Sequence, residues 1–154
     1  MALDIDAKLA ELGLSLPETT APAANYVPHV KAGDTLYVSG QISAGPEGLV
    51  TGVLGDDLDV EGGAAAARLC GLSLLAQVKS ALGGDWSRLE QVVKLTIFVA
   101  SAPGFTDQPK VGNGCSDLLV EVLGDAGRHA RSAVGVAALP LGVAVEVEGI
   151  FRVK

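Results

Sequence analysis

The sequence is poor in the residues that disulfide frameworks and metal centres need. Only two of its 154 residues are cysteine, only two are histidine, and aromatic residues make up 4% of the chain. Cys70 and Cys115 lie far apart and have no Cys-x-x-Cys spacing, so neither a disulfide framework nor a structural zinc site is expected. We therefore predict two reduced, packed thiols and no metal site.

Positive charge is scarce as well. The chain carries 11 Lys and Arg against 18 Asp and Glu, a formal net charge of −7, and its basic residues are scattered along the sequence. Because nucleic-acid binding needs a basic stripe that neutralises phosphates, we expect no nucleic-acid partner.

Long apolar runs are also absent. The longest uncharged run, residues 132–145, is shorter than the roughly 20 residues that span a bilayer, and Pro140 interrupts it. Asp4, Asp6 and Lys8 lie where a signal peptide would have its apolar core. These features predict a cytoplasmic protein with no membrane partner.

Aliphatic residues and glycine, in contrast, are abundant. Hydrophobic residues make up 49% of the chain and there are 20 glycines, so we expect a core of Val, Leu, Ala and Ile in which backbone segments approach closely. The length fits a single domain, residues 1–154. So much apolar surface on one small domain favours oligomerisation.

Hydrophobic spacing and turn residues predict a short helix, three strands, and two long helices interspersed with three further strands. The expected helices cover residues 4–12, 63–82 and 109–123. The first expected strand begins at Tyr26, and the other five cover residues 35–42, 49–53, 91–100, 132–138 and 143–153. This order is typical of an α+β domain with a mixed sheet of about six strands and both long helices on one face. Residues 1–21 would form a helical N-terminal extension, and a second copy of the chain would cover the other face of the sheet.

Alternation of side chains assigns faces to the expected strands. Along residues 35–42 it places Leu36, Val38 and Ile42 on one face and Gln41 on the other. Along the last strand it places the valines on one face and the charged side chains on the other. The apolar faces should therefore pack against the helices.

One long uncharged segment is bracketed by two charges. Arg131 precedes the fourteen residues 132–145, and Glu146 follows them. A buried arginine is unfavourable unless its planar fork meets an anion, and a carboxylate ligand matches that fork with two parallel hydrogen bonds. This predicts a small site with Arg131 as the carboxylate anchor. The alternative, which composition alone favours, is a surface arginine and a solvated glutamate.

Five landmarks together resemble one known family. They are Tyr26 with the stretch 36–42, the stretch 92–99, Ala130-Arg131-Ser132, Leu139-Pro140, and Val145-Glu146-Val147-Glu148. In this order they cover about residues 22–154, and they resemble the RidA/YjgF family of enamine/imine deaminases, once described as L-PSP endoribonucleases.

The resemblance implies a chorismate-mutase-like α+β fold and a homotrimer with clefts between its subunits. In the family, each cleft hydrolyses small imines or enamines, such as 2-aminoacrylate, to 2-oxo acids and ammonia without a metal or an organic cofactor. By motif position, Arg131 matches the arginine that grips the substrate carboxylate. Glu146 matches the carboxylate that is associated with the hydrolytic water.

The same resemblance implies further substrate-binding residues. They are Tyr26, Ser39, Gly40 through its backbone, Asn113, and Ser132 from the arginine motif. Asn113 would lie near the start of the second long helix, after a loop that is longer than usual in the family.

The chain also departs from the family pattern. His129 stands where many members have proline, Ala133 stands where many have cysteine, and Asn25 replaces the proline before Tyr26. Together with the extra N-terminal helix, these departures place the chain in a longer, less characterised branch.

His129 and Glu148 each have two interpretations. His129 lies two positions from Arg131 and could shuttle protons, or it could be a loop histidine in solvent. Glu148 could form a close carboxylate pair with Glu146, which would raise one pKa, or a salt bridge with Arg152. Burial would raise the pKa of Glu146 and Arg131 would lower it, so the sequence alone leaves the direction open.

The leading functional hypothesis is a trimeric imine/enamine deaminase. A binding module that captures a small 2-oxo acid without turnover would need Arg131 but not Glu146, since only hydrolysis needs a general base. The acidic charge balance disfavours an endoribonuclease. A chorismate mutase would need several cationic groups around its dianion, and the central stretch offers too few.

Overall fold

The computed structural model describes residues 4–19 and 24–154. The helices are α1 (Ile5–Glu11), α2 (Val60–Ala81) and α3 (Gln108–Leu123), and the strands are β1 (His29–Ala32), β2 (Thr35–Ile42), β3 (Ala44–Gly45), β4 (Gly48–Leu49), β5 (Leu89–Ala100), β6 (Ala130–Val136) and β7 (Val145–Val153). Three short 3-10 helices also occur, η1 (Trp86–Arg88), η2 (Gly124–Gly127) and η3 (Pro140–Gly142). None of the helices in the described ranges combines the length and the apolar character that crossing a bilayer requires.

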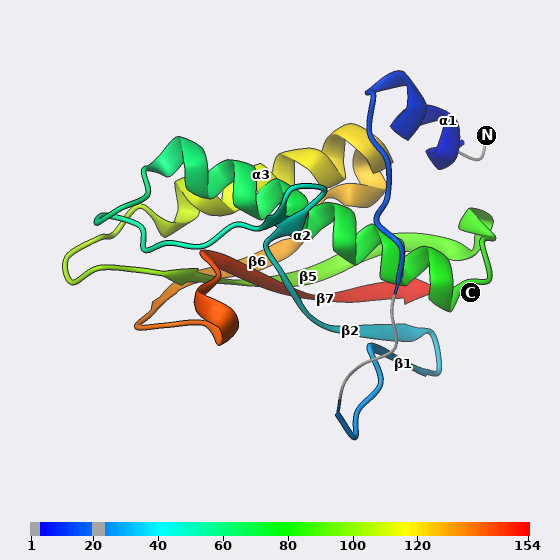
Figure 1. The fold of residues 1–154 in the computed structure, drawn as a ribbon. Helices are drawn as coiled ribbons and strands as arrows, with labels where there is room; N and C mark the ends of the chain where they lie inside the picture. The colour runs from blue at the N-terminus through cyan, green and yellow to red at the C-terminus, as the bar shows by residue number, and fades with distance from the viewer. Residues whose placement is uncertain (1–3, 20–23) are drawn as a thin grey trace.

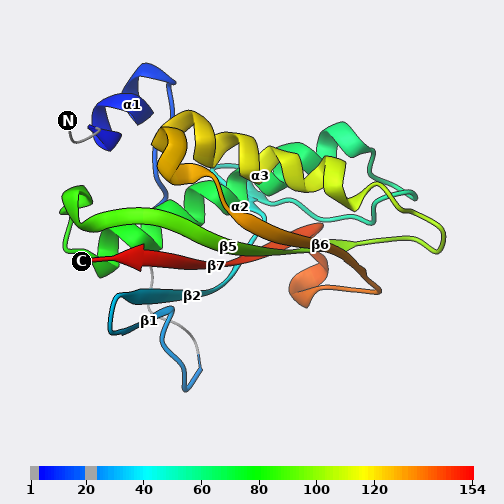
Figure 2. The same cartoon turned by 180° about the vertical axis from the view of Figure 1, so that it is seen from behind.

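The strands form a mixed sheet in the order β1-β2-β7-β5-β6, and β3 pairs with β4 in a small separate ribbon. Strands β5 and β6 are parallel and are joined through α3, whereas the other pairs of the large sheet are antiparallel. Helices α2 and α3 lie side by side over one face of the sheet (Figures 1 and 2). In the described part of the chain, no helix covers the opposite face, here called the open face. The predicted α+β class, with a mixed sheet and both long helices on one face, is confirmed.

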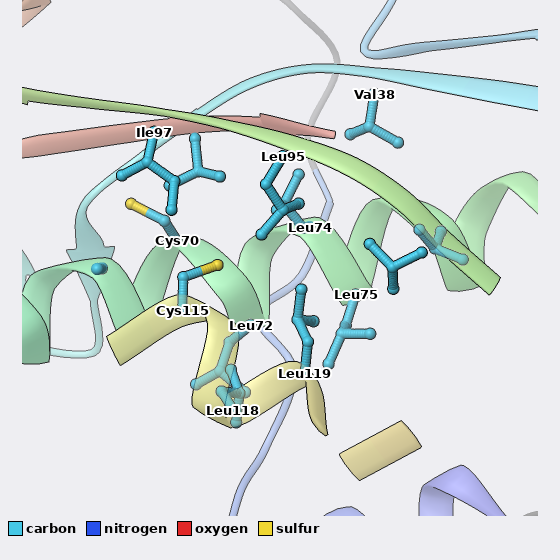
Figure 3. Packing of buried hydrophobic residues seen from close by; sticks show 14 of the residues in the cluster. Val38, Cys70, Leu72, Leu74, Leu75, Leu95, Ile97, Cys115, Leu118 and Leu119 are labelled. Atoms are coloured by element: carbon cyan, nitrogen blue, oxygen red, sulfur yellow. The ribbon is translucent and has the colours of Figure 1, made fainter. Parts of the chain in front are cut away.

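The core lies between the two long helices and the sheet. Cys70 and Leu74 from α2 and Cys115 from α3 point toward Leu95 and Ile97 of β5, and all five are fully buried (Figure 3). Both cysteines are free thiols, and burial raises the pKa of Cys115 to about 12. The prediction of reduced, packed thiols is therefore confirmed, and at such a pKa the Cys115 thiol stays protonated and unreactive.

Small residues let the two long helices approach closely. A side chain at Gly114 of α3 would collide with the backbone carbonyl of Ala64 in α2. This contact fixes the position of α3 against α2. The position of α3 in turn determines where its polar residues lie relative to the edge strand β6.

The N-terminal helix packs into the core instead of standing apart as an appendage. Asp4 caps α1 by accepting a hydrogen bond from the backbone N–H of Ala7, and Ile5 and Leu9 are buried with the main cluster. Asp6 also accepts hydrogen bonds from Lys79 and Trp86, at 3.0 and 3.1 Å, and these bonds lower its pKa. Part of the predicted extension, residues 1–3 and 20–21, falls outside the described residues.

Several predicted boundaries differ from the structure; β6, for example, covers residues 130–136 where a strand over 132–138 was expected. Tyr26 does not begin a strand, because β1 starts at His29, just after Pro28, which has no backbone N–H to donate. The strand expected at residues 49–53 is reduced to the end of β4 and an isolated bridge. Helix α2 starts three residues earlier than expected, because Asp59 caps the N–H of Gly62 at 2.7 Å.

Strand β2 contains a bulge that breaks the predicted alternation. Its register against β7 shifts between Val38 and Gln41, so Gln41 pairs with the buried Val147 and Ile42 pairs with Glu146. Because directly paired residues share a face, Gln41 lies on the helix-covered face and Ile42 on the open face. The sequence-based prediction for these two residues is therefore wrong.

Candidate functional site

The two charged residues that bracket the apolar segment lie on opposite faces of the sheet. Arg131 pairs with the buried Leu95 of β5, whereas Glu146 pairs with Phe98, three residues further along the same strand. An odd separation along a strand reverses the face, so Arg131 is on the helix-covered face and Glu146 is on the open face. Arg131 also lies near enough to Cys115 to oppose the rise in its pKa, which agrees with that placement.

Arg131 is held by two neutral acceptors. Its Nη1 donates to the Ser116 hydroxyl at 3.0 Å, and its Nη2 donates to the Pro109 carbonyl at 3.1 Å. Gly112 leaves room for the guanidinium, since a Cβ there would lie 3.3 Å from Nη1. Within residues 4–19 and 24–154, no carboxylate forms an ion pair with Arg131. Its charge is thus available to an anionic ligand.

A shallow groove of about 280 Å³ runs past this arginine. It is lined by Asn113, Ser116, Val120, Arg128, His129 and Arg131. The structure therefore brings Asn113 and Arg131 together, as the resemblance implied. We call Arg131, Asn113, Ser116 and His129 the arginine cluster.

His129 belongs to this cluster. It lies in the loop before β6, as the second interpretation expected, but its ring contacts protein groups and is not free in solvent. The ring is half-buried, with Nε2 at 2.9 Å from the Ser116 hydroxyl and Nδ1 at 2.6 Å from the Gly127 carbonyl. The sequence analysis missed Ser116, although its position three residues after Asn113 puts both on one side of a helix.

Glu146 lies in a second group on the open face. A Cβ at Gly40 would lie 2.7 Å from Glu146 Oε1, so the absence of a side chain at Gly40 makes room for this carboxylate. Burial raises the pKa of Glu146, and the neighbouring Glu148 raises it further. Arg131 lies on the other face and does not counter this shift, which settles the direction that the sequence left open. We call Glu146, Gly40 and Glu148 the glutamate cluster.

The expected salt bridge between Glu148 and Arg152 does not form. Arg152 Nε instead pairs with Glu90 Oε2 of β5 at 2.9 Å. Since β5 lies beside β7, Glu90 is within reach of Arg152, and Glu148 stays exposed near Glu146.

The other predicted residues are dispersed. Ser39 is half-buried, and its hydroxyl donates to the Pro28 carbonyl at 3.1 Å. Tyr26 is 58% exposed in the segment before β1. Ser132 pairs with Thr96 and Glu148 pairs with the same threonine, so Ser132 lies on the open face and not beside Arg131.

A cavity of about 420 Å³ belongs to neither cluster. It lies between the segment 15–19, helix α2 and the segment after β2, and its lining is mainly apolar. None of the residues predicted for catalysis or binding lines it, so its size does not mark the predicted site. No three His, Cys, Asp or Glu side chains gather to hold a metal ion anywhere in the described part of the chain.

The chain is similar to proteins of one family along nearly its whole length. A family model described as YjgF/chorismate mutase-like, with endoribonuclease in its description, matches residues 6–149. Protein TCP17 of Trypanosoma cruzi is 51% identical over 152 residues, which cover 97% of this chain and 94% of that protein. The 2-iminobutanoate/2-iminopropanoate deaminase of Mus musculus is 32% identical over 134 residues, covering 86% and 85%.

A solved structure shows the same fold. The crystal structure of protein Atu1372 from Agrobacterium tumefaciens, described there as of unknown function, has a TM-score of 0.91 and 48% identity. The match covers 97% of this chain and 93% of that one. Similarity of this extent includes the N-terminal helix as well as the sheet.

Proposed function

Since the chain belongs to the RidA/YjgF family, we propose that it hydrolyses small imines and enamines, such as 2-aminoacrylate, to 2-oxo acids and ammonia. The observation that carries the proposal is the half-buried Arg131, which is held by neutral acceptors and has no carboxylate partner among the described residues. The name of the related mouse deaminase supports the same substrate class.

The two clusters supply complementary parts of this chemistry. Arg131 binds the substrate carboxylate through two parallel N–H donors and so places the C=N carbon. Glu146 takes a proton from water as the water oxygen attacks that carbon, which gives a carbinolamine. The protonated Glu146 then gives its proton to the nitrogen. The C–N bond breaks as the hydroxyl group returns a proton to Glu146, which releases ammonia and leaves a carbonyl. A raised pKa makes Glu146 a stronger base than an ordinary carboxylate, which suits proton abstraction near neutral pH.

Both residues can act on one substrate only if two chains contribute. Within one chain they face opposite sides of the sheet, so the complete site would combine Arg131 of one subunit with Glu146 of a neighbour. The open face supports such an assembly, because it carries exposed apolar side chains, Val30, Tyr37 and Val134. We propose the homotrimer that the resemblance implies, with Tyr26, Ser39, Gly40, Asn113 and Ser132 as the remaining substrate contacts and the cytoplasm as the location.

Hydrolysis of enzymatically generated 2-aminoacrylate, measured in competition with semicarbazide, tests the proposal. Wild type should accelerate keto-acid formation, and Arg131→Ala and Glu146→Gln should each abolish the acceleration. Arg68 and Glu121 form an exposed ion pair between α2 and α3, so Arg68→Ala and Glu121→Gln are matched controls that should keep the activity. No acceleration with any small imine, together with 2-oxo acid binding that needs Arg131, would support the binding module instead.

Mixing the two inactive variants tests the shared cleft. In a randomly mixed ring of Arg131→Ala and Glu146→Gln chains, about one cleft in four would hold both intact residues. We therefore expect about a quarter of wild-type activity after joint refolding. An unmixed blend should stay inactive, and no recovery in verified mixed trimers would show that the cleft is not shared in this way.

An endoribonuclease, the activity in the family description, remains the weaker alternative. The net charge of −7 opposes the approach of a polyanion. The groove beside Arg131 holds one histidine, whereas acid–base cleavage of RNA by histidines would need a pair.

A further inference from the structure

Arg131 is the first member of a hydrogen-bonded chain that ends in the protein backbone. Its Nη1 donates to Ser116 Oγ at 3.0 Å, Ser116 Oγ lies 2.9 Å from His129 Nε2, and His129 Nδ1 lies 2.6 Å from the Gly127 carbonyl oxygen. We propose that Ser116 and His129 are positioning residues, which orient Arg131 for the substrate carboxylate. This inference rests on the anchor role given to Arg131 in the proposed function.

When the His129 ring is neutral, the chemistry of the groups sets the direction of every bond in this chain. The Gly127 carbonyl can only accept, so His129 Nδ1 carries the proton of the neutral ring and donates it. Nε2 is then an acceptor, and the Ser116 hydroxyl donates its single hydrogen to it. Because the guanidinium of Arg131 can only donate, the same hydroxyl oxygen accepts from Nη1. One arrangement of the hydrogens is therefore consistent with all three bonds of the chain.

The far end of the chain is fixed by close backbone packing. Gly127 is buried at the end of η2, and a Cβ on it would collide with the backbone carbonyl of Leu119 in α3. The glycine thus allows η2 to lie directly on α3, and the Gly127 carbonyl cannot easily move. His129 is held by that carbonyl, and Ser116 is held by His129.

As a result, the guanidinium plane of Arg131 is held in one orientation while its positive charge is not neutralised. Ser116 holds Nη1 and the Pro109 carbonyl holds Nη2, and both acceptors are neutral. Two of the five guanidinium N–H groups are engaged, and the others donate to no group among the described residues and can meet a ligand. Ordering the side chain before binding removes an entropic cost that the ligand would otherwise have to offset. A carboxylate partner would order the arginine equally well but would neutralise it.

The first test is the affinity for 2-oxobutanoate, measured by calorimetry. Ser116→Ala and His129→Leu should each weaken binding about tenfold, because the first removes the acceptor of Nη1 and the second frees the Ser116 hydroxyl that holds it. His129→Gln should stay within about threefold of wild type, since the amide oxygen of glutamine can still accept from Ser116. Ser80→Ala, at an exposed serine of α2, is the matched control and should bind like wild type. Unchanged affinity in Ser116→Ala and His129→Leu would overturn the inference, as would failure of His129→Gln to rescue.

The second test needs no ligand. The sequence has two histidines, so ¹⁵N spectra of labelled protein show two imidazoles, and His129→Gln identifies which signal belongs to His129. At about pH 8.5, where imidazoles are generally neutral, His129 should be the Nδ1–H tautomer. An Nε2–H tautomer would reverse the bonds and overturn the proposed chain.

These tests separate the inference from the proposed function. Binding and tautomer do not require turnover, so the expected results without imine hydrolysis would keep the positioning role and remove only the deaminase. If wild type fails to bind 2-oxobutanoate, Arg131 is not a carboxylate anchor and the positioning role falls with it.

Discussion

The arginine cluster and the glutamate cluster hold their principal side chains in different ways. Arg131 is fixed by two hydrogen bonds to neutral groups and lies in a polar groove. Burial and the charge of Glu148 raise the pKa of Glu146, and its carboxylate occupies the space that Gly40 leaves open. Arg131, the proposed anchor, is therefore ordered before a ligand binds. Glu146, the proposed base, has a raised pKa because burial and Glu148 both disfavour its charged form.

Removing the principal side chain of each cluster should separate binding from turnover. Glu146→Gln should lower kcat for imine hydrolysis by about 10²–10⁴-fold, because the general base is lost, while 2-oxobutanoate still binds. Arg131→Ala should instead abolish that binding. Steady-state kinetics and calorimetry on both variants, with Glu121→Gln as the control, test the division. Equal loss of binding in the two variants would contradict it.

Disturbing the close contact between α2 and α3, which positions the arginine cluster, should lower the stability of the fold. Gly114→Ala puts a methyl group against the Ala64 carbonyl, and overpacking of this kind destabilises a protein by about 1–3 kcal/mol or more. Urea denaturation should show a lower midpoint with an unchanged slope. Asn113→Ala, one residue earlier and exposed, should shift stability by no more than about 0.5 kcal/mol. A midpoint equal to wild type for Gly114→Ala would mean that the helices can separate at little cost.

Filling the space at Gly40 should displace the base without unfolding the protein. The added methyl group of Gly40→Ala meets the carboxylate end of a flexible side chain, which can swing away. We expect kcat to fall about tenfold or more, since small misplacements of catalytic groups are costly. The matched background is Glu146→Ala, in which Gly40→Ala should have no further effect on the residual rate. An additional loss there would point to another role for Gly40.

The smallest effect expected is on stability as a function of pH. The folded-state pKa of Glu146 is raised above its ordinary value of 4.5, so the folded state binds this proton more tightly than the unfolded state. The associated stability is present below pH 4.5 and is lost as pH rises through the folded-state pKa. Glu146→Gln should therefore be more stable than wild type at neutral pH.

Chemical denaturation of both proteins at acidic and neutral pH checks this sign. The difference in unfolding free energy between them should shrink once the carboxyl group of wild type is protonated in both states. The same difference at both pH values would mean that glutamine stabilises by packing and not through charge.

Local patterns in the sequence predicted most of the fold. Strand β2 begins and ends as predicted, because its β-branched and aromatic residues alternate between turn residues. The last strand alternates buried and less buried residues, so its valines and Glu146 lie on the predicted faces. Helix α3 begins with proline in its first turn and ends at Gly124, as the capping rules suggest.

The remaining features depend on contacts between distant segments. The bulge in β2 follows from its pairing with β7, and no residue pattern within β2 reports that pairing. Arg152 forms its ion pair with Glu90 and not with Glu148, because β5 lies beside β7. The contact of Ser116 with His129 depends on the 3-10 helix η2, because η2 places the Gly127 carbonyl where it holds the His129 ring. The family motif predicted Arg131 and Glu146 as site residues, but it could not show that they face opposite sides of the sheet within one chain.

The two clusters also differ in how far along the chain their parts lie. Helix α3, η2 and β6 are consecutive, so the hydrogen bonds around Arg131 close short loops and can form as soon as this one stretch folds. Gly40 and Glu146 meet only when strands from opposite ends of the chain pair, which carries a larger loop-closure entropy. During folding, the anchor should therefore be assembled before the base, and partial unfolding that frees β2 from β7 would separate Gly40 from Glu146 while leaving Arg131 in place.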